Sequence, residues 1–592
     1  MQIEVLSDIP EDPDLRQSWN RLAMQMTSPE VFYTYEWARA VCTAYRGSLQ
    51  PTLFLAREGR DLVALGSLAS DVQTGRVSFL AGNTADYCDF LSASERRAEF
   101  VQAVLRELEN RGTSRIMLTN LPAGSATIPA LDQLPASPYH LHRRTAYDCA
   151  RVVFDSQEDR EKIRESIVAR KRVRRNIREL EKRGSVSVRH DGGWDEIEPL
   201  LHAFSAAHVA RFLQTGRISN LVRKQRRDFL YVLARQLSPA GWIVLSRLFV
   251  GDTAIAWNYG FCFAGSWFWY QPTINGAYRD FSPGYCLLAK IVERACESPE
   301  VSVVDLGLGA EEYKERFATA TRETLYCELN LSLADHLRTE VRSRAAAFAR
   351  KSPAVENRLR GLRDELGKLV GRLRTDGARE TAGWALRRAW TSAIASDEVL
   401  FFEASSGGHE GCFEANDGNG SSASLQLLDA QLLGEAAMIY ADDPATLAYL
   451  IRSAERLRSG AARGFVLVSQ GRPVHFCWLA DFEGFEIAEL GQRLQAPCRE
   501  AVMIFDCYTP ASARGNAFFA QAIRRLAEHA HREGKSPWIF SAATNLSSRR
   551  GIGKAGFAHR YSLWRKRLLF AYERRGRQTA ASPETAPRAV SA

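Results

Sequence analysis

Hydrophobic and polar residues follow two patterns along the chain, one with the period of a strand and one with the period of a helix. Together they predict a mixed α/β protein. Apolar runs of strand length predict a strand pair over 51–71 with its turn at Gly59–Asp61. A second hairpin is predicted over 253–273, around Ala264–Gly265. Helical spacing of the apolar residues over 95–112 predicts an amphipathic helix that ends in a glycine. This mixture of strands and helices favours layered α/β architecture.

The same rhythm returns in the last third of the chain. The pattern predicts a hairpin over 465–481, a strand over 501–509, a helix over 516–534 and a strand over 537–544. A further helix and strand are expected to continue to about Leu569. The repetition predicts another α/β unit.

Breaks in the pattern divide the chain into five segments. We expect α/β units over 1–150, 151–335 and 396–570. The segment 336–395 is rich in Arg, Ala and Leu with few turn signals, so it is predicted to be a basic helical connector. Residues 571–592 are rich in Ala, Pro and Arg and are expected to form a disordered tail.

Composition excludes several classes of protein. The chain has 592 residues, of which 45% are hydrophobic and 25% charged, as in an ordinary globular protein and unlike a disordered or collagen-like chain. No apolar run reaches the roughly 18–20 residues of a membrane span. The polar, acidic N-terminus does not resemble a secretory signal. The 11 cysteines are scattered without a CxxC pair, so we expect reduced thiols in the cytoplasm.

The net charge of +9 is concentrated in two segments. Arg160–Arg183 carries +7 and His336–Ala395 carries +8, which leaves −6 for the rest of the chain. The first segment is predicted as one basic helix over 161–184. Such helices bind anionic membrane surfaces or RNA phosphates, so we predict peripheral contact with the inner membrane, keep tRNA as the alternative and expect no DNA partner. Equally, the cations can belong to a solvated face paired with acidic patches.

The sharpest signal for chemistry is the loop 510–517, PASARGNA, between a strand and a helix. The N-terminus of a helix offers unpaired N–H groups and a partial positive charge that can hold a phosphate. Arg514 adds a fork of donors, and Gly515 allows close approach of the backbone. Alone, this segment is also consistent with an ordinary strand–helix crossover.

The stretch 542–557, AATNLSSRRGIGKAGF, follows the next strand, and its Asn and Ser side chains can cap a helix. With the loop 510–517 it resembles the GNAT acyltransferase superfamily, in which an R-G-x-G/A-x-G/A loop holds the pyrophosphate of acyl-coenzyme A and an N…S…KxGF element lies beside its pantetheine arm. The resemblance implies a set of donor-binding residues: Arg514, Gly515, Asn516, Asn545 and Ser548. Two positions depart from the pattern, since Ala517 stands where Gly is usual and Phe519 could crowd the pyrophosphate.

The first two units resemble a different GNAT branch. The segments that carry the resemblance are FYTYEWARA (32–40), GNTADYCDFL (82–91), the basic helix (171–184), residues 254–295 and VVDLGLGAEEYKERFA (303–318). Their order is similar to the bacterial CelD-type family, named for cellulose and exopolysaccharide biosynthesis and described as acetyltransferase-like. The resemblance implies two GNAT-like folds in tandem, distantly related to the FemABX peptidyltransferases, and three such folds in the whole chain.

In this half, the resemblance places a phosphate loop before the helix at 285–298, with cofactor-binding residues Ser282, Pro283 and Gly284. The alternative is a plain helix start with Pro in its first turn. The predicted catalytic residues follow the next strand: Asp305, Glu312, Tyr313 and Lys314. Acyl transfer needs a base for the proton of the attacking group and a proton donor for the thiolate. The alternative for Glu311–Arg316 is a solvated helix face with i,i+4 pairs.

The predicted substrate-binding residues are Asp86, Tyr87, Asp89, Trp269 and Tyr270. Carboxylates beside a ring can hold a sugar or an amino group, although a turn stabilised by Asp side chains is equally ordinary. Core packing is the alternative for Trp269 and Tyr270. No metal site is expected, because His202 and His208 have poor spacing for one.

The sequence therefore predicts an acyltransferase that moves an acetyl or other short acyl group from acyl-coenzyme A, without a metal. The acceptor would be an amine or hydroxyl of a small molecule or of a cell-envelope or exopolysaccharide precursor. Direct transfer is favoured, because no cysteine lies in a recognisable base-activated setting. The alternatives are a FemABX-like aminoacyl or peptidyl transferase and an inactive GNAT-fold scaffold in polysaccharide biosynthesis.

Overall fold

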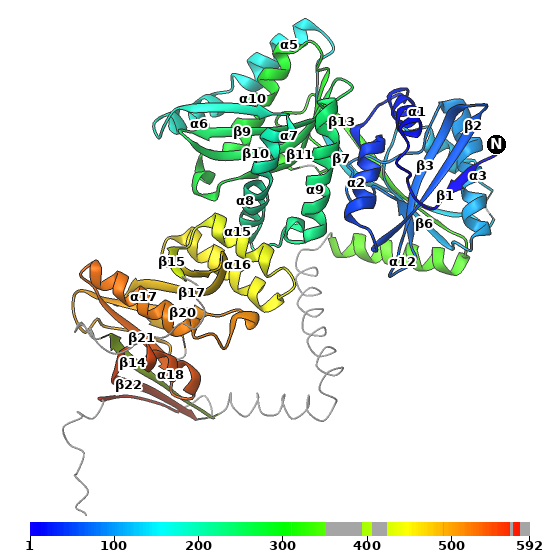
Figure 1. Cartoon of the computed structure of the whole chain (residues 1–592). Helices are drawn as coiled ribbons and strands as arrows, with labels where there is room; N and C mark the ends of the chain where they lie inside the picture. The colour runs from blue at the N-terminus through cyan, green and yellow to red at the C-terminus, as the bar shows by residue number, and fades with distance from the viewer. Residues whose placement is uncertain are drawn as a thin grey trace, which may run out of the picture. The chain divides into compact units, whose positions relative to one another are not determined.

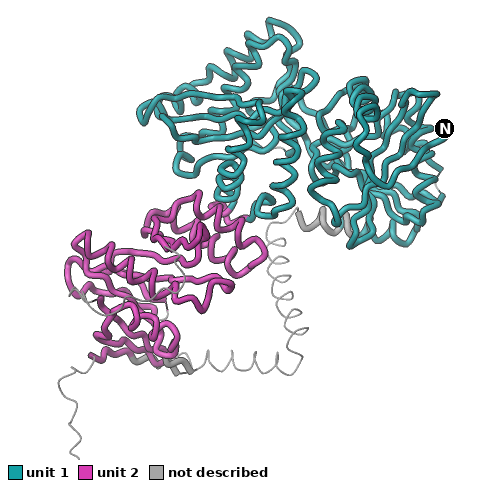
Figure 2. The backbone as a smooth tube through the Cα atoms, in the orientation of Figure 1, with its two compact units in different colours: residues 1–212, 218–351 teal, residues 213–217, 352–592 magenta. Residues whose placement is uncertain are grey.

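The computed structural model of the chain describes residues 1–135, 137–309, 311–350, 394–404, 423–488, 490–568 and 572–579. The chain divides into two compact units (Figure 2). Unit 1 comprises residues 1–212 and 218–351, and unit 2 comprises residues 213–217 and 352–592. Both contain a large sheet with helices on it, which confirms the mixed α/β class. Most of the predicted connector, residues 351–393, lies outside the described residues.

The first half of unit 1 combines short helices with a mainly antiparallel sheet. Its helices are α1 (Pro13–Met24), α2 (Tyr35–Ala44), α3 (Ser94–Asn110) and α4 (Thr127–Asp132). Its strands are β1 (Glu4–Leu6), β2 (Leu49–Glu58), β3 (Asp61–Asp71), β4 (Val77–Phe79), β5 (Leu91–Ser92) and β6 (Arg115–Pro122). The predicted strand pair and amphipathic helix are therefore confirmed.

The second half of unit 1 has its main core around α10. Its strands are β7 (His140–Val153), β8 (Val186–Asp191), β9 (Ile243–Val250), β10 (Thr253–Phe263), β11 (Ser266–Ile274), β12 (Val303–Asp305) and β13 (Ala320–Asn330). Its helices are α5 (Gln157–Ile163), α6 (Lys171–Glu181), α7 (Trp194–Ile197), α8 (Leu201–Leu213), α9 (Lys224–Leu237), α10 (Pro283–Glu297), α11 (Glu312–Glu315) and α12 (Leu333–Arg350). α10 buries one whole face, including Leu287, Ile291 and Val292, because its apolar residues recur at helical spacing.

One continuous sheet joins the two halves of unit 1 (Figure 1). Its 13 strands include the path β1-β2-β3-β4-β6-β13-β7-β12-β11-β10-β9-β8, with β5 paired to β3. β13 lies between β6 and β7 and is antiparallel to both, so Leu329 faces Ile116 on one side and Leu141 on the other. The expected boundary at residue 150 falls inside β7, so the first two predicted units share a sheet.

Unit 2 is built on a second sheet, in the order β15-β16-β17-β20-β21-β14-β22-β23. The strands are β14 (Ile394–Ala404), β15 (Ser424–Leu427), β16 (Arg463–Ser469), β17 (Arg472–Asp481), β20 (Ala501–Tyr508), β21 (Ser536–Ala542), β22 (Phe557–Leu568) and β23 (Tyr572–Thr579). The helices are α15 (Ala430–Ile439), α16 (Pro444–Ser459), α17 (Phe518–Arg532) and α18 (Leu546–Lys554). Two short strands, β18 (Glu486–Ile487) and β19 (Gln492–Arg493), pair separately.

Each of the three predicted units contains a parallel strand pair bridged by a helix. The pairs are β4–β6 across α3, β11–β12 across α10 and β20–β21 across α17. The other named pairs of the two large sheets are antiparallel. A parallel pair requires a long crossover, which the helix supplies. This recurrence supports three similarly built units, and their boundaries stay predictions.

The single basic helix predicted over 161–184 is wrong. The chain forms α5, a π-helical turn over Arg164–Val168 and then α6. Val168 and Val173 are both buried in the same core. A continuous helix would turn residues five apart onto different faces, so the break allows both side chains to reach that core.

The predicted disorder of the tail is wrong for residues 572–579. This segment forms β23, which pairs antiparallel with β22 along its whole length. The Arg577 guanidinium lies 4.1 Å from the centre of the Tyr561 ring. The Ala- and Pro-rich composition begins only after Thr579, and residues 580–592 lie outside the described residues.

Candidate functional site

A cleft opens in unit 2 where two parallel strands part. β20 and β21 pair as far as Ile504 and Ile539. Beyond that point β20 stays with β17, with Tyr508 opposite Phe476, while β21 stays with β14. The strands are thus held apart by their outer neighbours, and the gap between them belongs to a cleft of about 1360 Å³.

The predicted phosphate loop forms one wall of this cleft. Arg514 Nε donates to the Thr509 carbonyl at 3.2 Å, and Asn516 Nδ2 donates to the Ala513 carbonyl at 3.3 Å. Gly515 has a φ of +87°, and open space lies where its Cβ would stand. Ala517 is the N-cap of α17, and among the described residues no side chain caps this helix. The first-turn N–H groups therefore remain available at the cleft wall for an anion.

The structure accounts for both departures from the family pattern. Ala517 has a φ of +56°, in the left-handed region where Gly is favoured, which explains why Gly is usual there. Phe519 packs against Gly551 of α18, and its ring centre lies 5.6 Å from that of His475. A Cβ on Gly551 would lie only 2.5 Å from the Phe519 ring. A glycine on the facing helix therefore makes room for the bulky ring.

Replacing Gly551 with alanine is expected to destabilise unit 2 by about 1–3 kcal/mol, because the new methyl group must displace Phe519. Gly553→Ala is the matched control in the same helix, since nothing lies within 4 Å of its Cβ position. That variant should instead be about 0.5–1 kcal/mol more stable than wild type, because alanine favours the helix. Urea denaturation measures both free energies of unfolding. Equal effects of the two substitutions would contradict the close contact between Phe519 and Gly551.

The second predicted donor element lies on the opposite wall. Asn545 Oδ1 accepts from the Ser548 N–H at 3.1 Å and caps α18, which confirms the predicted cap. Asn545 and Ser548 both line the cleft together with Arg514, Gly515 and Asn516. The structure thus brings all five predicted donor-binding residues of unit 2 to one cleft, and their role stays a prediction.

Two cleft residues were missed from the sequence. His475 on β17 is 1% exposed, and its Nδ1 lies 2.8 Å from Thr509 Oγ1. Burial lowers the pKa of His475 to about 3, so the ring is neutral. Asp506 has a φ of +45° at an irregularity in the β17–β20 pairing, and its carboxylate bonds to Arg456 at 2.5 Å. A single histidine or aspartate in a strand gives no distinctive sequence signal.

In unit 1, Asp305 lies at the point where β11 and β12 stop pairing. It is 1% exposed and accepts from the Tyr87 hydroxyl at 3.0 Å and from the Gly307 N–H at 2.9 Å. Arg151 Nε lies 3.4 Å from its carboxylate. Burial raises the pKa of Asp305. Asp305 and Tyr87, which were predicted separately as a catalytic and a substrate-binding residue, are therefore in direct contact.

Asp86 joins this cluster from the first half of unit 1. Gly307 has a φ of +70°, and the Asp86 carboxylate approaches it closely. A Cβ atom on residue 307 would lie only 2.6 Å from Asp86 Oδ2. This contact explains the first glycine of the DLGLG sequence. Burial, and then the charge of Asp305, raise the pKa of Asp86 to about 7, against the opposing charges of Lys314 and Arg226.

The other aromatic and basic candidates lie around the same cluster. Lys314 is 5% exposed, and its Nζ donates to the Leu308 carbonyl at 2.7 Å. Trp269 Nε1 donates to the Tyr313 hydroxyl at 3.2 Å, and Arg226 donates to the Tyr270 hydroxyl at 2.7 Å. Trp269 and Tyr270 are both buried, which favours the core-packing alternative over an exposed ring platform.

Glu312 does not join the cluster. It is exposed and pairs with Arg316 one turn later, as the solvated-face alternative expects. Its side chain is therefore poorly placed to take a proton beside Asp305.

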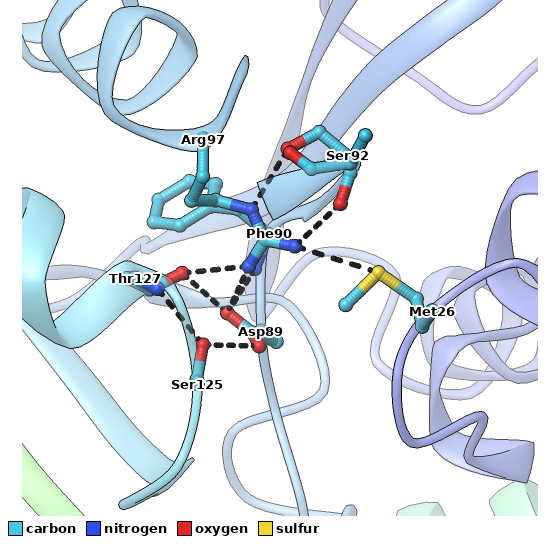
Figure 3. A network of polar contacts seen from close by, with 8 residues as sticks. Met26, Asp89, Phe90, Ser92, Arg97, Ser125 and Thr127 are labelled. Atoms are coloured by element: carbon cyan, nitrogen blue, oxygen red, sulfur yellow. Dashed lines mark hydrogen bonds and ion pairs between the residues drawn. The ribbon is translucent and has the colours of Figure 1, made fainter. Parts of the chain in front are cut away.

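Asp89 also lies apart from the cluster, in a buried polar network (Figure 3). Its carboxylate accepts from Arg97 at 3.0 Å and from the hydroxyls of Ser125 and Thr127, each at 2.5 Å. These contacts use both carboxylate oxygens in holding α3, α4 and the Asp89 loop together. The structure favours the stabilised-turn alternative over substrate binding.

The predicted phosphate loop of unit 1 enters α10 through Ser282, which has a φ of +49°. Ser282 does not cap the helix with its side chain, Pro283 occupies the first turn, and a Cβ on Gly284 would lie 3.2 Å from Ile274. Ser282 and Ala517 therefore enter their helices through the same left-handed conformation. The cofactor role of Ser282, Pro283 and Gly284 stays a prediction.

Several arginines of the basic segment contact backbone carbonyls or aromatic rings of unit 1. Arg160 is 9% exposed and donates to four carbonyls around the end of α10, including those of Ala295 and Val301 at 2.7 Å each. Arg172 and Arg183 lie over the rings of Tyr285 and Phe281. These contacts explain part of the positive charge, and binding to a membrane or to tRNA stays a prediction.

Metal-ligand clusters and membrane-spanning helices are both absent from the described residues. No group of three or more His, Cys, Asp or Glu side chains gathers there as metal ligands would. No helix there combines the length and apolar content needed to cross a bilayer.

Comparison with known proteins gives one family match, which covers part of the chain. Residues 168–315 match the model of the acetyltransferase (GNAT) domain family. No curated protein matches the chain.

Solved structures are similar at low identity. FemX is 9% identical, with 55% of this chain and 97% of FemX covered and a TM-score of 0.40. The C-terminal domain of a lysylphosphatidylglycerol synthetase from Agrobacterium fabrum, itself described as putative, is 9% identical, with coverages of 55% and 94% and a TM-score of 0.38. A tandem GNAT protein from the clavulanic acid pathway is 13% identical, with coverages of 55% and 98% and a TM-score of 0.33. These likenesses carry no argument about activity. Residues 168–315 of this mixed α/β chain are similar to the acetyltransferase (GNAT) domain family.

Proposed function

We propose that the protein is an acyltransferase that moves an acetyl or other short acyl group from acyl-coenzyme A to an amine or hydroxyl. The observation that carries this proposal is the cleft between β20 and β21, where an uncapped helix N-terminus meets Arg514. The GNAT domain in unit 1 supports the same class of reaction. The resemblance of the first two units also implies an acceptor from a cell-envelope or exopolysaccharide precursor, which we propose for unit 1 and do not extend to the cleft of unit 2.

The residues of the cleft suit the parts of such a donor. The N–H groups of the first turn of α17 and the Arg514 guanidinium supply hydrogen bonds and positive charge to a pyrophosphate. Gly515 leaves room for close approach. Arg550 and Lys554 on α18 add positive charge to the lining. Bringing donor and acceptor together in one gap removes much of the entropic barrier to their reaction.

Replacing Arg514 with alanine is expected to raise the Kd for acetyl-coenzyme A about 10–100-fold, because hydrogen bonds to charged groups contribute about 1.5–3 kcal/mol. Isothermal titration calorimetry of the full chain measures this change. Arg525→Ala is the matched control, since it removes the same charge from the exposed side of α17 outside the cleft.

A third variant, Ser282→Trp, separates the two donor sites. It should leave the Kd unchanged if the donor binds in unit 2 and abolish binding if the donor binds at α10. Absence of binding to wild type, or equal Kd values for wild type and Arg514→Ala, would contradict the proposed donor site. Titration with aminoacyl-tRNA would then test the FemABX-like alternative.

A further inference from the structure

We propose that the acceptor bound in unit 2 is an amine carried on an apolar, ring-sized body. The subsite is formed by three phenylalanines and a carboxylate: Phe485, Phe505, Phe540 and Asp506. This inference rests on the proposed function, since it names the second substrate of the same cleft. It narrows the acceptor from any amine or hydroxyl to one chemical class.

The position of the subsite follows from the two faces of the sheet. Cys507, Phe518 and Phe519 pack with the core on the α17 face. Phe485, Phe505 and Phe540 pack with the core on the other face. The cleft is lined by residues of both sets, because it includes the gap between β20 and β21. A donor on the α17 side and an acceptor on the other side can therefore meet at the gap without competing for space.

The aromatic side chains define the body of the ligand. The Phe485 ring centre lies 4.9 Å from that of Phe505 and 6.0 Å from that of Phe540, and all three residues remain partly exposed. They come from a loop and from the two strands that part, and Ile487 and Ala488 extend the same wall. Partly exposed rings that converge on a cleft favour a ligand with an apolar ring. Such a ligand buries the exposed surface of the three phenylalanines and packs edge to face against them.

The charges at this end favour an amine over an anion. Arg456 is already bonded to Asp506 at 2.5 Å, and its guanidinium lies 4.7 Å from the Trp478 ring centre and 5.1 Å from that of Phe505. Asp506 remains 33% exposed and Glu486 63% exposed. Glu486 also pairs with Arg493 of β19 at 3.8 Å, but Arg493 does not line the cleft. The lining at this end therefore carries two carboxylates and the single guanidinium of Arg456, while Arg514, Arg550 and Lys554 belong to the donor walls.

The transfer step balances with these two substrates alone. The bound ammonium first releases one proton to water. The neutral amine nitrogen then attacks the thioester carbonyl carbon, so a C–N bond forms and the C–S bond breaks. The sulfur leaves with the electron pair of the C–S bond, and the proton lost by nitrogen ends on the released thiol of coenzyme A. The products are an amide and coenzyme A.

Calorimetry with three probes tests the ligand class on the full chain in the absence of donor. Phenethylamine has both the ring and the amine, phenethyl alcohol lacks the amine, and glucosamine lacks the apolar body. We expect phenethylamine to bind at least tenfold more tightly than either of the others. Phe485→Ala and Phe540→Ala should each raise its Kd about tenfold, as loss of a buried ring contact predicts.

Two further variants and one separate measurement distinguish the possible outcomes. Leu427→Ala removes an exposed apolar side chain of unit 2 outside the cleft and should change nothing. Asp506→Asn should weaken phenethylamine about five- to tenfold and leave phenethyl alcohol unchanged. The Kd for acetyl-coenzyme A, measured separately, should stay within about twofold of wild type in the two Phe variants.

The subsite is overturned if phenethylamine fails to bind, if glucosamine binds equally well, or if the Phe variants bind phenethylamine as wild type does. Normal acetyl-coenzyme A binding beside such a result leaves the acyltransferase proposal standing. Conversely, Phe485-dependent phenethylamine binding without acetyl-coenzyme A binding supports the subsite and contradicts the proposed function.

Discussion

Replacing Arg97 with alanine is expected to lower the free energy of unfolding of unit 1 by about 3–5 kcal/mol, because it leaves a buried carboxylate without its cation. Arg97 and Asp89 have side chains only 3% and 4% exposed. Arg97 also donates to Ser92 and Thr127, so the substitution removes several hydrogen bonds (Figure 3).

The effect can be measured for unit 1 within the full chain. Hydrogen exchange of peptides from α3 and β6 in increasing urea reports the stability of this unit. The neighbouring Arg96→Ala variant is the control, since Arg96 pairs with Glu58 at the surface and its loss should change little. Equal, small effects of the two substitutions would show that the Asp89 network does not stabilise the fold.

The stability of unit 1 is expected to fall as the pH rises from about 4 to about 7, and Asp86→Asn is expected to remove much of this fall. The pKa of Asp86 is raised from 3.8 to about 7. Between these values the folded chain binds a proton that the unfolded chain releases, so rising pH favours the unfolded state. At about 1.36 kcal/mol per pKa unit the full loss would be about 4 kcal/mol. Water reaches part of Asp86, so we expect on the order of 2 kcal/mol.

Urea denaturation followed by hydrogen exchange at pH 4.5, 6 and 7.5 measures this dependence for wild type and Asp86→Asn. Burial raises the pKa of Glu30 in the same unit to about 7, so the variant should keep a smaller fall of the same sign. Asp132→Asn is the control, because that carboxylate is exposed. Parallel pH profiles for wild type and Asp86→Asn would contradict the assignment.

Local patterns in the sequence were enough to predict most elements. The hairpins at Gly59–Asp61 and Ala264–Gly265 follow from alternating apolar residues around turn-forming residues, which are short-range signals. The sharing of β13 between β6 and β7 was not predicted. It depends on pairing between residues some 200 positions apart, and no local pattern records such a partner.

The candidate sites also divide into those that local sequence patterns predicted and those that they did not. The Arg514 loop and the Asn545 cap were predicted because each combines a turn, a helix start and characteristic residues within a few positions. Asp89 was assigned to substrate binding because a loop carboxylate fits either role. Arg97 gave the missing signal, since it lies on the apolar face of α3 with Phe100 and Val101. A cation in that stripe predicts a buried anionic partner.

The position of β13 also constrains how the protein is made on the ribosome. β6 and β7 are complete once residue 153 has been synthesised, yet the strand between them ends at residue 330. At about 5–20 residues per second, translation leaves these strand edges without their partner for about 10–35 s. Exposed edges of this kind pair readily with other chains. The nascent N-terminal half is therefore expected to be the stage of biosynthesis at which chaperone binding matters most.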